Sequence, residues 1–171
     1  MDTVVEQKWI AQDPQKVIDA VTQELQRLEN LFSMYLPQSE VARINENAGI
    51  SPVVVSDETF VLLALAKEYG EEHEGAFDIT IGPVSALWGI TSDHPQVPPE
   101  KELEEALALV HLDDLVLDET TKTAYLRRTG ERIDPGAIAK GYAAGLAREV
   151  ALEAGATCGY LSIGGNLMVI G

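Results

Sequence analysis

The chain has 171 residues, which is enough for one domain by the usual range of about 100–200 residues. Hydrophobic residues make up 46% of it, so the chain can build a core and is not disordered by composition. Its net charge of −16 repels the phosphates of nucleic acids and anionic lipids, so we expect no nucleic-acid partner.

The first part of the chain predicts two strands and three helices. Residues 1–10 indicate the strand, and Asp13 before Pro14 is typical of a helix start. This helix should bury apolar residues at helical spacing: Val17, Ile18, Val21, Leu25, Leu28, Leu31 and Phe32. Ser39 should cap a short helix over 39–45. Ser56, after a short strand at 53–55, should cap a long helix with an inward face of Leu62, Leu63, Ala66 and Tyr69.

The middle of the chain is rich in loops. Residues 75–83 and 91–99 predict loops on either side of a short helix over 84–88. An acidic amphipathic helix is expected over 99–109. Strands at 115–117 and 123–126 should form a hairpin that turns at 118–122.

A third long helix is predicted to open at Asp134 and Pro135, as N-cap and first helical residue. Its inner face should carry Ile138, Tyr142, Leu146 and Val150, with Leu152 as a further candidate, and Gly155 should end it. Two strands, 160–163 and 167–170, flank a glycine turn. Because an exposed strand edge invites pairing, we expect that the chain is truncated there or pairs with a second polypeptide. The fold class is α+β, with helices packed on a mixed or antiparallel sheet.

Two segments combine glycine with polar groups that suit a ligand. In Gly75–Pro83, backbone groups could reach a planar ligand while Asp78 accepts a hydrogen bond from it; alternatively, the loop is a structural connection with Phe77 in the core and Asp78 capping a turn. In 134–142, Gly136 and Gly141 each cost about 1 kcal/mol in a helix, so a close approach is expected. Lys140 opposes the helix dipole unless an anion such as pyrophosphate binds there.

Other candidates carry less information. Tyr35 could stack on a base or a flavin, or it could be a core residue with its hydroxyl at the surface. The turn at Gly164-Gly165-Asn166 is interpreted as structural. The three histidines and the single cysteine, Cys158, lack the spacing of a zinc site.

In order and spacing, several segments together resemble the ApbE family of FAD:protein FMN transferases. They are Met1–Thr3, Ser33-Met34-Tyr35, Ser39-Glu40, Ile44-Asn45, Gly75–Pro83, Leu87-Trp88, Ile133–Ala143 and Ser162–Asn166. The resemblance covers essentially all of 1–171 and implies a single domain with the T-fold-like architecture of that family. Asp2, Pro135 and Gly145 depart from the family's usual glycine, leucine and aspartate.

The resemblance implies an enzyme that binds FAD and, with Mg²⁺, transfers FMN to a threonine or serine hydroxyl of a target flavoprotein, such as a redox membrane complex, releasing AMP. The resemblance implies no particular catalytic residue. The residues that would contact FAD are Met1, Tyr35, Ala76, Phe77, Asp78, Asp134 and Lys140. Ala137 would offer its backbone carbonyl to the metal, and the other metal ligands would follow Gly171.

The resemblance also implies an extracytoplasmic location, periplasmic or at the cell surface, with anchoring by a segment outside this sequence; a cytoplasmic location is left open. Two alternatives to a transferase remain. One is a non-catalytic protein that binds or carries flavin. The other is a structural half-domain that acts only with a second chain.

Overall fold

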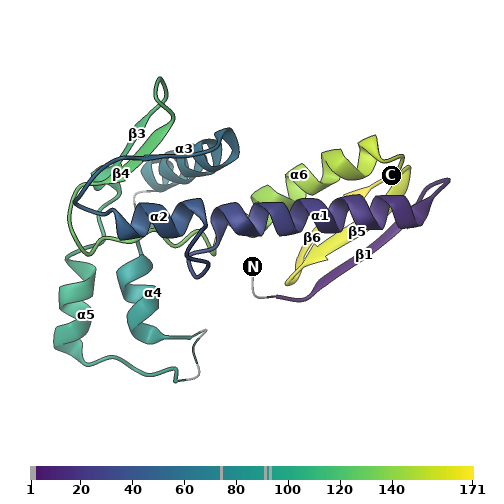
Figure 1. Ribbon diagram of the computed structural model, residues 1–171. Coiled ribbons are helices and arrows are strands. Elements are labelled where there is room, and N and C mark those ends of the chain that lie inside the picture. The colour runs from purple at the N-terminus through teal and green to yellow at the C-terminus, as the bar shows by residue number, and fades with distance from the viewer. Residues whose placement is uncertain (1–2, 74, 91, 93) are drawn as a thin grey trace. The chain divides into compact units, whose positions relative to one another are not determined.

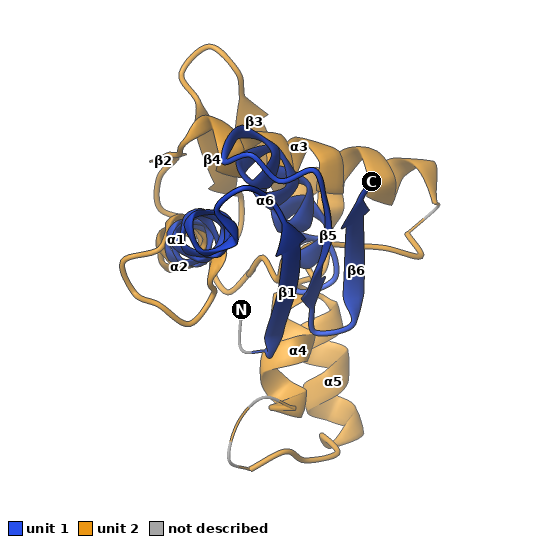
Figure 2. Cartoon of the chain, turned by 90° about the vertical axis from the view of Figure 1, so that its right-hand side faces the viewer, with its two compact units in different colours: residues 1–31, 136–171 blue, residues 32–135 orange. Residues whose placement is uncertain are grey.

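A computed structural model of the protein describes residues 3–73, 75–90, 92 and 94–171. The chain divides into two compact units, coloured in Figure 2: residues 1–31 with 136–171 form unit 1, and residues 32–135 form unit 2. That residues 1–171 form a single domain stays a prediction. In the part of the chain that the structure describes, no helix is long and apolar enough to cross a membrane.

Unit 1 is built on a three-stranded antiparallel sheet in the order β1-β5-β6 (Figure 1). The strands are β1 (Val5–Ile10), β5 (Cys158–Ile163) and β6 (Asn166–Ile170). Side chains alternate between the faces. Trp9, Leu161 and Ile163 are buried on the face toward α1 (Pro14–Phe32) and α6 (Ala139–Glu153), whereas Tyr160 and Leu167 are exposed on the other face.

The first helix follows the sequence prediction closely. The Asp13 carboxylate accepts a hydrogen bond from the Lys16 amide (3.2 Å), and α1 begins at Pro14. Of the predicted apolar stripe, five residues are buried and Ile18 and Leu31 are half-buried. The buried ones are Val17, Val21, Leu25, Leu28 and Phe32.

Two predictions for the third long helix were wrong. The helix begins at Ala139, five residues after Asp134, and Ile138 is its N-cap. The Asp134 amide donates to the Ile79 carbonyl (2.8 Å), and residues 136–138 form a turn before the helix. The buried face also consists of small residues, which let a helix approach a sheet closely: Ala139, Ala143, Ala144, Ala147 and Ala151. The predicted inner residues are only half-buried. The helix does end at Gly155, which has a φ of +101°.

Unit 2 surrounds a small antiparallel sheet in the order β2-β4-β3. Its strands are β2 (Val53–Val54), β3 (Leu115–Asp118) and β4 (Thr123–Leu126). Its helices are α2 (Glu40–Glu46), α3 (Asp57–Glu72), α4 (Gly82–Trp88), α5 (Glu100–Leu107) and the 3-10 turn η1 (Leu112–Asp114). The largest fully buried hydrophobic side chains of the unit are Ile44, Leu62, Leu63, Ile79, Leu115, Leu126 and Ile133. The α+β fold class is confirmed, because helices pack with antiparallel sheets in both units.

One residue of α3 was placed on the wrong face. Tyr69 was expected to point inward but is 46% exposed, and its ring edge meets His73. The neighbouring Gly70 faces the interior instead, where a Cβ atom would lie 2.4 Å from Leu112 and 3.0 Å from the Phe77 carbonyl. The close approach of these two residues leaves no room for a tyrosine ring on that side of the helix.

Candidate functional site

Tyr35 lies at an open cavity within unit 2. The cavity has a volume of about 430 Å³ and is lined by Met34, Tyr35, Pro37, Ala42, Asn45, Glu46, Gly130, Glu131 and Arg132. Tyr35 is 61% exposed, so its interpretation as a core residue is wrong. An exposed aromatic ring beside a cavity can stack on a planar ligand.

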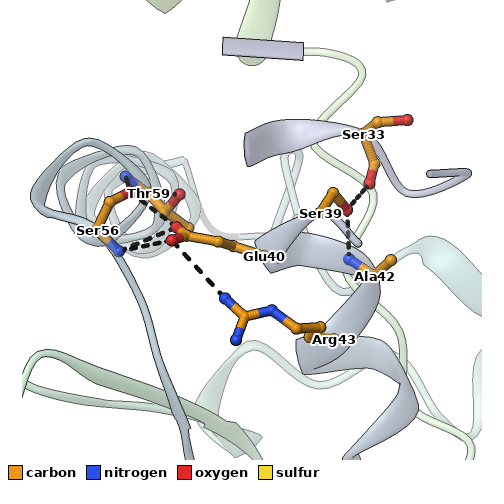
Figure 3. Close-up of polar contacts among 7 residues, drawn as sticks. All are labelled: Ser33, Ser39, Glu40, Ala42, Arg43, Ser56 and Thr59. Atoms are coloured by element: carbon orange, nitrogen blue, oxygen red, sulfur yellow. Dashed lines mark hydrogen bonds and ion pairs between the residues drawn. The ribbon is translucent and has the colours of Figure 1, made fainter. Parts of the chain in front are cut away.

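The serine and glutamate that follow Tyr35 hold this region in place (Figure 3). Ser39 is fully buried and caps α2: its Oγ accepts from the Ala42 amide (3.0 Å) and donates to the Ser33 carbonyl oxygen. The Glu40 carboxylate accepts from the Ser56 amide (3.0 Å) and from the Ser56 hydroxyl (2.8 Å), at the start of α3. Ser39 and Glu40 therefore serve as supports for the fold around Tyr35.

The loop that carries Ala76, Phe77 and Asp78 is only partly buried. Ala76 is exposed, and Phe77 and Asp78 are half-buried, so Phe77 is not a core residue. Asp78 Oδ1 accepts from both the amide (2.8 Å) and the hydroxyl (2.7 Å) of Thr80, which closes a turn. Because both bonds end on Oδ1, the other carboxylate oxygen can accept a hydrogen bond from a ligand.

This loop continues into direct pairing with the Ile133–Asp134 segment, more than fifty residues later in the chain. The Asp134 amide donates to the Ile79 carbonyl (2.8 Å), and the Gly82 amide donates to the Arg132 carbonyl (3.2 Å). A Cβ atom on Gly82 would lie 2.6 Å from the Arg132 carbonyl oxygen, so only glycine permits this approach. Tertiary pairing thus brings together two of the segments that the sequence singled out.

A buried acidic group borders the same cavity. Glu131 is fully buried and accepts from the Arg128 amide (3.0 Å) and the Arg128 Nε (2.8 Å). Arg128 Nε also lies 2.8 Å from Asp114 Oδ2. Burial raises the pKa of the Glu131 carboxyl, Asp114 raises it further, and the hydrogen bonds from Arg128 oppose the rise.

Unit 1 gathers the remaining segments around the turn between β5 and β6. Gly164 has a φ of +57°, and a Cβ atom there would lie 2.3 Å from Thr3 Oγ1. A Cβ atom on Gly141 would lie 3.7 Å from Asn166 Nδ2. Lys140 stands in the first turn of α6, where its Nζ donates to the Gly136 carbonyl (3.5 Å). The turn, considered structural from the sequence, therefore lies beside Thr3 and the start of α6.

The predicted site residues are thus distributed over both units. Unit 2 holds Tyr35, the loop 76–78 and Asp134, whereas unit 1 holds Lys140 and Ala137. Ala137 is exposed in the turn before α6. The prediction for Met1 lies outside the described residues. None of these assignments to FAD or metal is tested by the structure, so they stay predictions.

Sequence reasoning missed the role of Asn45. Its amide pairs with both backbone groups of Ile133, at 3.0 Å and 2.7 Å. The sequence marked Ile44-Asn45 only as one of the segments that resemble the family, without a partner for the amide. The partner lies 88 residues away, so the pairing could not be read from local spacing.

Comparisons with known proteins support the resemblance of these segments to the ApbE family. The ApbE family model matches residues 1–171. The chain is 35% identical over 151 residues to an FAD:protein FMN transferase of Klebsiella pneumoniae, covering 88% of this chain and 48% of that protein. It is 33% identical over 152 residues to an FAD:protein FMN transferase of Treponema pallidum, covering 86% of this chain and 42% of that protein.

Two solved structures share the fold. The ApbE protein of Thermotoga maritima has a TM-score of 0.86 at 33% identity, over 99% of this chain and 54% of that chain. The flavin transferase ApbE of Vibrio cholerae has a TM-score of 0.91 at 25% identity, over 100% of this chain and 57% of that chain. The chain spans about half the length of the curated relatives it matches. With the family model matched along all 171 residues, the chain belongs to the ApbE family.

Proposed function

We propose that the natural protein that carries this sequence is an FAD:protein FMN transferase, and that residues 1–171 supply part of its FAD-binding surface. The observation that carries the proposal is the hydrogen-bonded pairing of the Asp78–Gly82 loop with Arg132–Asp134 beside the cavity of Tyr35. The names of relatives such as the Klebsiella pneumoniae protein support the same activity.

The residues of this chain would bind and orient FAD. Tyr35 would stack on a ring of the ligand, and Asp78 would accept a hydrogen bond from it at Oδ2. Lys140 would attract the pyrophosphate, helped by the partial positive charge at the start of α6, a helix with no acidic residue in its first turn. A net charge of −16 makes such local positive charge necessary for an anionic ligand.

The transfer itself would be a phosphoryl-group displacement. The hydroxyl of a threonine or serine on the acceptor protein attacks the phosphorus of the FMN part and loses its proton. The phosphorus–oxygen bond to the AMP part breaks, and AMP leaves. Positioning and electrostatic stabilisation supply most of the rate in such reactions, so binding residues can matter as much as a general base. No residue of this chain is assigned as that base.

The proposed Mg²⁺ does not find a complete site in these residues. Magnesium takes octahedral oxygen ligands. Within the described ranges, no three His, Cys, Asp or Glu side chains are grouped so as to hold a metal ion. Ala137 would offer one backbone carbonyl, and no step of the proposed mechanism is assigned to the metal. When bound, Mg²⁺ would neutralise charge on the pyrophosphate.

FAD titration, followed by the quenching of flavin fluorescence, tests the proposal on the natural protein that carries this sequence. We expect micromolar binding, and a rise in Kd of about tenfold for Asp78→Ala and Lys140→Ala, since about 1.4 kcal/mol corresponds to a factor of ten. Lys101→Ala is the control, because Lys101 is an exposed lysine of α5 that pairs only weakly with Glu105 (3.7 Å). Absence of FAD binding would refute the proposal.

A second assay separates transfer from binding. Incubation with FAD and candidate acceptor flavoproteins should attach FMN covalently to a threonine or serine, which mass spectrometry detects, and should release AMP. Binding without transfer to any acceptor would favour the non-catalytic flavin carrier. The identity of the acceptor, an extracytoplasmic location and membrane anchoring are further parts of this proposal.

A further inference from the structure

The backbone N–H and C=O of Ile133 pair with the side chain of Asn45, in the place that a neighbouring strand would take. Asn45 Nδ2 donates to the Ile133 carbonyl (3.0 Å), and the Ile133 amide donates to Asn45 Oδ1 (2.7 Å). The two bonds use both polar groups of one peptide residue. A primary amide has the donor and acceptor of a peptide group, so Asn45 reproduces the pairing that a neighbouring strand would give.

The opposite edge of the same segment is held by the loop after Asp78. The Arg132 carbonyl accepts from Gly82 (3.2 Å), and the Asp134 amide donates to Ile79 (2.8 Å). In extended backbone, the polar groups of alternate residues point to opposite edges. The segment is therefore fixed from both sides, and the Ile133 side chain is fully buried as well. Without Asn45, one edge would keep two unpaired polar groups next to the core.

Asn45 is itself anchored and faces the candidate site. It belongs to α2, whose first turn is fixed by the Ser39 cap and by the bonds of Glu40 to Ser56. It also lines the cavity of Tyr35. The side chain thus joins the helix that borders this cavity to the segment that ends in Asp134.

We infer that Asn45 is a positioning residue for FAD, and this inference rests on the proposed function. It fixes the backbone of Asp134 relative to the Tyr35 cavity, so that the site is formed before the ligand arrives. When only a fraction of molecules has the competent arrangement, the apparent Kd rises by the inverse of that fraction. Loss of the paired amide should therefore weaken FAD binding although Tyr35, Asp78 and Lys140, the residues proposed to contact FAD, are unchanged.

Two substitutions test the inference on the natural protein that carries this sequence. Asn45→Ala removes both bonds and should raise the Kd for FAD about tenfold, at a temperature where the variant is fully folded. Asn45→Asp keeps the acceptor, but at neutral pH it places a carboxylate oxygen against the Ile133 carbonyl. A protonated aspartic acid restores a donor. The Kd of Asn45→Asp, divided by that of the wild type, should therefore fall toward one as the pH is lowered.

The ratio to the wild type is taken at each pH because both proteins share the ionisable groups that line the same cavity, Glu46, Glu131 and Arg132. Asn47→Ala is the matched control. Asn47 is the C-cap of α2 and loses two side-chain bonds, from Nδ2 to the Arg43 carbonyl (2.8 Å) and from the Ser51 hydroxyl to Oδ1 (3.4 Å), but neither bond reaches Ile133. It should lower the melting temperature and leave the Kd unchanged.

The outcomes separate the two proposals. If the wild type binds no FAD, the proposed function fails and this inference falls with it. If the wild type binds FAD but Asn45→Ala changes the Kd by less than about twofold, the positioning role is wrong. It is also wrong if Asn47→Ala weakens binding as much as Asn45→Ala, or if low pH does not restore binding to Asn45→Asp.

Discussion

Replacement of Ser39 by alanine should destabilise unit 2 by about 2–3 kcal/mol. The Ser39 hydroxyl makes two bonds while fully buried, one from the Ala42 amide and one to the Ser33 carbonyl. Loss of a helix N-cap costs about 1 kcal/mol. Loss of the partner of the Ser33 carbonyl costs roughly another 1–2 kcal/mol, because this half-buried group loses a bond from a fully buried hydroxyl. The two contributions add because they involve different backbone groups.

Urea unfolding, followed by circular dichroism, measures this effect. With a slope of about 2 kcal/mol per molar urea, the midpoint for Ser39→Ala should fall by about 1–1.5 M. Ser51→Ala is the control, because Ser51 is exposed and its hydroxyl makes one long bond to Asn47 Oδ1 (3.4 Å). The control should change stability by less than about 0.5 kcal/mol. Equal midpoints for the two variants would refute the role assigned to Ser39.

Two further changes test other parts of the structure. Gly164→Ala should destabilise more than Gly165→Ala: both have positive φ, but only Gly164 would clash with Thr3, whereas nothing lies within 4 Å of Gly165. Equal losses in thermal unfolding would contradict that contact. Glu131→Gln should flatten the pH dependence of stability. The raised pKa of Glu131 means that its contribution is present below the ordinary value of 4.5 and is lost as the pH rises through the folded-state pKa. If the stability of the wild type and of Glu131→Gln changes with pH in the same way, this contribution of Glu131 is excluded.

Local signals in the sequence determined most of the helix starts. Asp13, Ser39 and Ser56 were predicted as caps, and each accepts a hydrogen bond from an amide three residues later. The glycine turn between β5 and β6 also followed the prediction, with φ values of +57° and +89° at its two glycines. Caps and tight turns depend on neighbouring residues only, so one stretch of sequence contains all the information.

The start of α6 shows where local reasoning fails. Asp134 and Pro135 have the residue types of a helix start, yet α6 begins only at Ala139. Residues 136–138 form a turn in place of the first helical turn, and the Asp134 amide pairs with the Ile79 carbonyl more than fifty residues away. The burial of alanines in α6 has a similar origin: periodicity marks the large apolar residues, but the close approach of the helix to the sheet selects the small ones.

The sequence by itself identified which segments matter, because their order and spacing resemble those of one family. Only the tertiary structure decided how those segments are held: Ser39 and Glu40 as supports, Asn45 as a substitute strand for Ile133, and Gly82 as the point of closest approach to Arg132. The physical reason is that residue types specify chemistry and local backbone preference. Which backbone groups pair over 88 residues is set by the packing of the whole unit.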